Sequence, residues 1–308
     1  QIQNVNLNLL YMFKRNNNKL ISIFLLSFLF GLFINNKIQN SIFFMPKEYK
    51  LIKNIVNKIA SKNELGNQKI LFSINNGSYM TWNTKSLDLC KGEECWYFNN
   101  LNPYKNYKSI NGININNLSN QAYLYGGIEG YAWNGIVWIS KSTFRAFGEN
   151  NDLLACLIGH EISHIIFDDH IKESQILSSK MKDAGISDNY KSSKEEKEIE
   201  EKKLLQMEIS RTIESQADNN STKLLINSGF PKEICLKFLT YITKFEKLDT
   251  KTNPNSTHPG YLERYSSLEK FIENYQVKNE LKVDKSSKWR WEFNRDLNIL
   301  TFIPLNKF

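Results

Sequence analysis

The spacing of apolar residues predicts both helices and strands once the chain passes residue 45. From Ile52 to Ile59, isoleucine and valine recur every three or four positions, which predicts an amphipathic helix beginning at Pro46. Lys69–Ile74 alternates between polar and apolar residues as a short strand does, and Ile136–Ile139 is a strong β-type run. The chain is therefore expected to combine helices with a small sheet.

Later patterns predict that helices dominate. A segment that is apolar nearly all round follows Asn150 and Asn151, either of which can cap it, and this predicts a buried helix that continues to about Met181. Ser193 followed by Glu196 is a capping-box start for another helix. Further helices are expected at residues 193–227, 231–248 and 261–275. The expected fold class is α+β, mainly helical, with a small antiparallel sheet beside the buried helix.

Two stretches differ from this pattern. Residues 84–120 are rich in Asn and turn-forming residues, which predicts an irregular insertion loop. Residues 288–304 contain two β-type runs around Asn294–Asp296, which predicts a hairpin. The expected organisation is an N-terminal extension and anchor at 1–45, a globular domain at 46–280 and a hairpin tail at 281–308.

An uncharged apolar segment, Leu20–Ile34, follows three basic residues and precedes a polar stretch. At about 1.5 Å per residue it is short for a full membrane span, and resembles the core of a signal sequence. No small-x-small cleavage site follows it, so an uncleaved signal anchor is the preferred interpretation over a buried core helix. The basic flank would stay in the cytoplasm. The rest of the chain is then expected on the periplasmic, lumenal or intermembrane-space side.

The charge of the chain argues against nucleic-acid binding. The formal net charge is +8, but lysines are scattered and the densest charged stretch, 193–203, mixes Glu and Lys. A nucleic-acid binder would concentrate basic residues in a stripe interleaved with aromatics. No nucleic-acid partner is therefore expected.

The four cysteines fall into two groups. Cys90 and Cys95 close a short loop, and a local disulfide and two free thiols are both open readings. No second Cys pair or nearby His completes a zinc set around them. Cys156 and Cys235 lie in apolar helical runs and are expected to be small buried hydrophobic residues.

The buried helix carries an H-E-x-x-H motif, His160-Glu161-Ile162-Ser163-His164. Residues four apart lie on one helix face, so both imidazoles can face one metal ion. Glu161 lies about 100° from His160 around the helix, within reach of an open coordination position. The alternative is a buried helix with two hydrogen-bonded histidines and no metal, and the motif alone does not decide between them.

Two further observations favour a metal. The chain has only four histidines, and the motif contains two of them. Glu214 and Asp218 lie four apart on another expected helix. Glu214 is available as the third ligand that a catalytic zinc needs, and Asp218 can accept the outer N–H of a ligand histidine.

Together with Thr257-His258-Pro259, these motifs resemble those of the HtpX/CAAX-prenyl-protease-like family of gluzincin metallopeptidases. The resemblance covers roughly residues 46–275, although 84–120 has no obvious counterpart. It implies a zincin-like domain that holds one Zn²⁺ through His160, His164 and Glu214. It also implies Glu161 as general base and Asp218 as partner of a ligand histidine.

The same resemblance assigns roles to three other residues. It places His258 near the metal, as a donor to the oxyanion or as an inhibitory fourth ligand. It gives Arg264 a structural salt bridge. His170 lies one place later than a histidine often seen in the family, so a surface position is expected for it.

The function expected from these features is a membrane-associated zinc endopeptidase that cleaves extended or unfolded polypeptides, as in protein quality control. We hypothesise that Gly135, Ile136, Val137 and Trp138 form an open strand edge along which substrate binds. The alternatives are a zinc-containing chaperone or adaptor with little turnover, and a membrane-tethered helical protein without metal.

Overall fold

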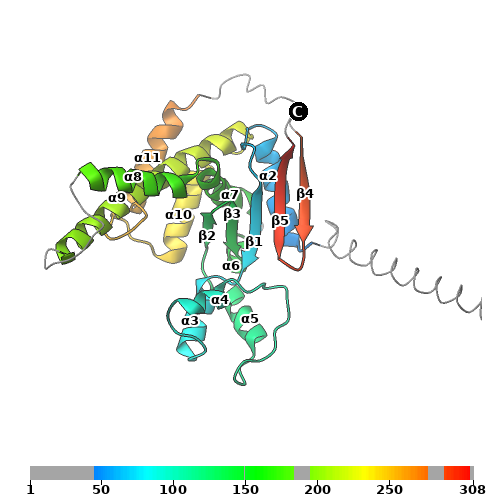
Figure 1. Ribbon diagram of the computed structural model, residues 1–308. Helices are drawn as coiled ribbons and strands as arrows, with labels where there is room; N and C mark the ends of the chain where they lie inside the picture. The colour runs from blue at the N-terminus through cyan, green and yellow to red at the C-terminus, as the bar shows by residue number, and fades with distance from the viewer. Residues whose placement is uncertain (1–44, 149, 184–194, 277–287, 306–308) are drawn as a thin grey trace, which may run out of the picture.

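A five-stranded mixed sheet lies at the centre of the protein, in the order β2-β3-β1-β5-β4 (Figure 1). The computed structural model describes residues 45–148, 150–183, 195–276 and 288–305. The strands are β1 (Ile70–Asn75), β2 (Gly130–Trp133), β3 (Ile136–Ser140), β4 (Lys288–Asn294) and β5 (Ile299–Leu305). The expected small sheet is present, and every strand run named above is part of it.

The sheet is not wholly antiparallel. β1 and β3 pair in parallel, with Phe72 opposite Val137, whereas the other three pairings are antiparallel. The expectation of an antiparallel sheet was therefore wrong at its centre. Parallel strands need a long crossover, and the helices between β1 and β3 form it.

The C-terminal strands form the expected hairpin and extend the same sheet, because β5 pairs with β1. Two buried hydrogen bonds add to this pairing. Tyr49 donates its hydroxyl to the Asn298 carbonyl over 2.6 Å, and the Asn298 amide donates to the Ile74 carbonyl over 2.5 Å. The hairpin thus shares the core of the globular domain.

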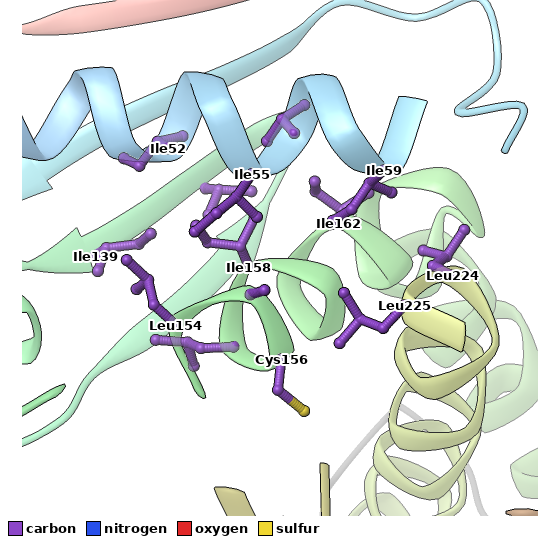
Figure 2. Close-up of a cluster of buried hydrophobic side chains, with 14 of the residues drawn as sticks. Ile52, Ile55, Ile59, Ile139, Leu154, Cys156, Ile158, Ile162, Leu224 and Leu225 are labelled. Carbon is purple, nitrogen blue, oxygen red and sulfur yellow. The ribbon is translucent and has the colours of Figure 1, made fainter. Parts of the chain in front are cut away.

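The main core lies between the sheet and two helices, α2 (Lys47–Ala60) and α7 (Asn151–Ile166). Figure 2 shows isoleucines of α2 facing those of α7, with Leu224 and Leu225 of a further helix beside them. The spacing of apolar residues in α2 places them on one face, whereas α7 is buried nearly all round. Asn150 caps α7 by accepting from the Leu153 amide. This packing fixes α7, the helix that carries the H-E-x-x-H motif.

The segment predicted as an irregular insertion loop contains several helices between its irregular stretches, so that prediction holds only in part. Its helices are α3 (Ser78–Ser86), the 3₁₀ helix η2 (Gly92–Cys95), α4 (Trp96–Asn99) and α5 (Ile115–Tyr125). They enclose a small apolar cluster of their own around Met80, Cys95 and Leu118, at one end of the sheet (Figure 1). Asn114, one of the residues that suggested a loop, is the N-cap of α5. We call residues 78–125 the helical insert.

The remaining helices surround α7. They are α6 (Lys141–Phe147), α8 (Asp169–Asp183), α9 (Glu195–Asn227), α10 (Ile234–Glu246) and α11 (Tyr261–Asn274). α8 and α9 extend side by side away from the sheet (Figure 1). The expected continuous helix from 150 to 181 is broken at Asp168, which has a left-handed backbone (φ 50°).

The predicted anchor Leu20–Ile34 and the predicted cap Ser193 lie outside the described residues. Among the helices that are described, none has the length and apolar character needed to cross a bilayer.

Both cysteine pairs are disulfide-bonded. Cys90 is joined to Cys95, which decides between the two readings left open by the sequence. Cys156 is joined to Cys235, linking α7 to α10, a disulfide that the sequence did not predict. Both residues are buried, as expected of small apolar side chains.

Candidate metal centre

His160 and His164 lie on successive turns of α7 with their Nε2 atoms 3.1 Å apart. Their rings are nearly perpendicular, at 84°. His160 is buried and His164 is half-buried. The i, i+4 spacing of the motif therefore brings both ring nitrogens to one point.

Glu214 of α9 faces the same point. Its Oε2 atom lies 3.2 Å from His160 Nε2, and Oε1 lies 3.5 Å from His164 Nε2. The three donor atoms fall within 4.8 Å of one another. Helices α7 and α9 pack closely near this point. A Cβ added to Gly159 of α7 would stand only 2.8 Å from Ser221 Oγ of α9. The structure thus brings the three predicted ligands together.

Asp218, one turn beyond Glu214, lies behind His160. Its Oδ1 atom is 3.1 Å from His160 Nδ1, off the line of a regular hydrogen bond. Arg264 of α11 donates to both carboxylate oxygens, over 2.7 and 2.8 Å. This bidentate pair is buried and agrees with the salt bridge expected for Arg264.

Asp169 holds the second histidine and was missed at the sequence level. Its Oδ2 atom lies 2.9 Å from His164 Nδ1, and its side chain is buried. The left-handed Asp168 ends α7 and starts α8 in a new direction, which turns Asp169 back towards the site. The signal was Asp168-Asp169 itself, since Asp tolerates this backbone conformation better than most residues.

The acidic groups around this point outnumber the cations. Glu161, Asp169 and Asp218 are buried and Glu214 is mostly so, whereas Arg264 is the one buried guanidinium among the described residues here. Burial lowers the pKa of His160, but Asp218 and Glu214 raise it to about 10. Burial raises the pKa of Glu214, and the adjacent His160 reverses this and holds it below the usual range. The site therefore favours an added positive charge.

The donor set fits a zinc ion. When each Nδ1 proton faces a carboxylate, both Nε2 atoms carry lone pairs towards each other, and a metal ion between them would accept both lone pairs. Glu214 Oε2 is buried and has no hydrogen-bond donor within the described part of the chain. Two imidazoles and one carboxylate are a ligand set of catalytic zinc sites.

Glu161 lies beside this point at the wall of a cavity of about 730 Å³. Its carboxyl is buried, and burial raises its pKa. Gly130 of β2 is so near that an added Cβ would stand 2.7 Å from Glu161 Oε1. His160, His258 and residues of β2 and α10 also line the cavity.

The strand edge at the cavity is β2, not the segment predicted from sequence. Ile136, Val137 and Trp138 belong to β3, which pairs with β1 on one side and β2 on the other. Gly135 lies in the tight turn between β2 and β3, with φ 79°. The hypothesis of an open edge at 135–138 is therefore wrong. The outer side of β2 has no partner strand among the described residues.

His258 lies near the metal-binding point, as the resemblance implied. Its Nε2 atom is 3.4 Å from Glu214 Oε2, and its side chain is largely exposed. Arg211 of α9 holds the preceding loop by donating to the carbonyls of Pro254 and Ser256. His170 lies apart, half-buried, with its ring 6.4 Å from that of Trp133.

The model of peptidase family M48 matches residues 103–272. This match covers more than half of the chain and includes the H-E-x-x-H motif, Glu214, His258 and Arg264. No curated protein and no solved structure matches the chain. The matched region contains every residue that the geometry above brings to the metal-binding point. The chain therefore belongs to peptidase family M48, a family of zinc-dependent metallopeptidases.

Proposed function

We propose that this protein is a zinc endopeptidase that cleaves extended or unfolded polypeptides, with its catalytic domain outside the cytoplasm. The observation that carries the proposal is the convergence of His160, His164 and Glu214 beside Glu161, in a cavity bordered by the β2 edge. A zinc ion held by the first three residues supplies a Lewis acid and makes a bound water more acidic.

The residues of the chain have separate roles in this proposal. Glu161 accepts a proton from the attacking water and passes it to the departing amine, and burial makes its carboxylate a stronger base. Asp218 and Asp169 keep the Nδ1 protons of His160 and His164 in place. His258, at the cavity, donates a hydrogen bond to the oxygen that becomes negative in the transition state.

The unpaired outer side of the edge strand β2 supports the proposal that substrates bind in an extended conformation. A chain laid along the outer side of β2 would add a strand to the sheet through main-chain hydrogen bonds. Such bonds do not depend on side-chain identity, which suits the cleavage of unfolded chains in quality control. The cavity is large enough for several residues of an extended chain, which favours internal cleavage.

The location outside the cytoplasm rests on two features. Leu20–Ile34 has the composition of a signal anchor, although it lies outside the described residues. The two disulfides suit an oxidising compartment, because such bonds are rare in the reducing cytosol.

The test compares wild type with Glu161→Gln in casein degradation, with and without a zinc chelator. We expect Glu161→Gln to lower the rate by about 10²- to 10⁴-fold because the base is lost. It should still bind one zinc per chain by metal analysis. Glu208→Gln, at an exposed position of α9, is the control and should keep full activity.

Full activity of Glu161→Gln would remove this residue as the base. Casein binding without chelator-sensitive cleavage by the wild type would instead support the adaptor function.

A further inference from the structure

Three aromatic side chains from three elements meet at the cavity. Tyr131 of β2 and Trp138 of β3 are opposite each other in register, and their rings stack with centroids 5.5 Å apart. Trp96 of α4 meets Tyr131 edge-on, with centroids 6.4 Å apart. All three line the cavity that contains Glu161. We call them the aromatic group.

Much of this aromatic surface faces solvent. Trp96 is 56% exposed and Tyr131 is 42% exposed. Isolated exposed aromatics are common, and this helical insert has others, Trp82 and Tyr97, that do not line the cavity. The aromatic group differs because Tyr131 contacts both tryptophans and all three residues line the same cavity as the catalytic carboxylate.

The helical insert holds Trp96 in place against β2. Trp96 directly follows Cys95, which is buried and disulfide-bonded to Cys90. The Glu129 carboxylate, next to the start of β2, accepts hydrogen bonds from the Ser78 amide and hydroxyl at the start of α3. Trp96 precedes the region matched by the family model, whereas Tyr131 and Trp138 lie within it.

We propose that Trp96, Tyr131 and Trp138 form a subsite that binds a large apolar side chain of the substrate, with aromatic side chains preferred. Aromatic rings bury a large area and prefer the stacked and edge-to-face contacts that this group already shows. Tyr131 directly follows Gly130, where an added Cβ would meet the Glu161 carboxylate, so the subsite lies close to the proposed base.

This inference rests on the proposed function and narrows its substrate class. Large aromatic side chains are mostly buried in folded proteins and become accessible when a protein unfolds. A subsite for them would direct the enzyme towards unfolded chains, while the main chain is held by β2.

The test uses fluorogenic peptides of one sequence in which a single position near the cleaved bond is Phe, Leu, Ala or Asp. The zinc-loaded full-length chain should favour Phe over Ala at one such position. Trp96→Ala should lower kcat/KM for the Phe peptide by about tenfold, mainly through KM, and change the Ala peptide little. Trp96→Phe should keep the preference.

Tyr97→Ala is the matched control, because Tyr97 is the next residue of α4, is at least as exposed as Trp96 and does not line the cavity. Tyr131→Ala, on a different element, should lose the same preference, which makes the test independent of how the insert folds. An unchanged preference in both Trp96→Ala and Tyr131→Ala, or an equal loss in Tyr97→Ala, would overturn the proposal.

A measurement of peptide binding distinguishes failure of this inference from failure of the proposed function. If the wild type cleaves no peptide, the proposed function fails, and the subsite is judged by the affinity of Glu161→Gln for the Phe and Ala peptides. Tighter binding of the Phe peptide that Trp96→Ala removes would support the subsite. Equal binding of the two peptides would overturn it.

Discussion

At the scale of single residues, the metal centre depends on what lies behind each histidine. His160 is backed by Asp218, which is shared with Arg264, whereas His164 is backed by Asp169. A carboxylate on Nδ1 fixes the tautomer and leaves Nε2 free as a ligand. The two aspartates therefore prepare the same site from different helices, α9 and α8.

Replacing Asp169 should weaken metal binding without unfolding the protein. In Asp169→Asn the side chain keeps its size but loses the charge that faces His164. We expect zinc affinity to fall by about 10- to 100-fold, measured by competition with a chromophoric chelator.

The control is Asp168→Asn at the adjacent exposed position, where Asn also tolerates the left-handed backbone. It should bind zinc like the wild type. Equal affinities in both variants would show that Asp169 does not support His164.

The sequence predicts the inner part of this centre but not all of it. The four-residue spacing within one helix places His160 and His164 on the same face. The same spacing of Glu214 and Asp218 identifies a second helix that can supply carboxylates. Asp169 is harder to predict, because its position depends on a helix break whose one local signal is the pair Asp168-Asp169.

At the scale of elements, the close approach of β2 to α7 brings the strand proposed to bind substrate next to Glu161, the proposed base. A Cβ added to Gly130 would meet both Glu161 and Leu157, and the backbone of Gly130 has no unusual φ. An Ala there is not strained in itself, and its methyl group meets only the ends of two side chains. The position of the catalytic carboxylate is thus set partly by the lack of a side chain on the edge strand.

Gly130→Ala should therefore impair catalysis more than stability. The new methyl group would displace Glu161, and a shift of about 1 Å can lower kcat by about a hundredfold. Zinc content and the urea midpoint should stay close to those of the wild type. A normal kcat would show that Glu161 does not depend on this contact.

A helix or strand can be predicted from the sequence when the pattern that specifies it lies within the element itself. Helices α2, α7, α10 and α11 lie near their expected positions, since their apolar spacing is a local property. The parallel pairing of β1 with β3 brings together strands that are distant in sequence, so no local pattern reveals it. The insert was misjudged because Asn is frequent throughout this chain, and in α5 it caps a helix.

At the scale of the whole molecule, the two disulfides close loops of very different length. Cys156–Cys235 joins α7 to α10 across a sequence separation of 79 residues, whereas Cys90–Cys95 closes a separation of 5 within the helical insert. The sequence could not pair Cys156 with Cys235, because their proximity follows from the packing of helices.

Removing the two disulfides should have unequal effects on the free energy of unfolding. From loop length, Cys156→Ala/Cys235→Ala should cost about 4.5 kcal/mol and Cys90→Ser/Cys95→Ser about 2 kcal/mol. Urea unfolding of the zinc-saturated variants measures both, each serving as the control for the other. If Cys90→Ser/Cys95→Ser lost more free energy of unfolding than Cys156→Ala/Cys235→Ala, the short disulfide would stabilise parts of the protein beyond the helical insert.

In the proposed binding mode, the shortness of β2 limits how much of a peptide can be held through its backbone. Four residues at about 3.3 Å each give a docking track of about 13 Å. Lengthening a bound peptide beyond that track would add little affinity from main-chain contacts. Discrimination among cleavage sites must then come from a few side chains close to the scissile bond.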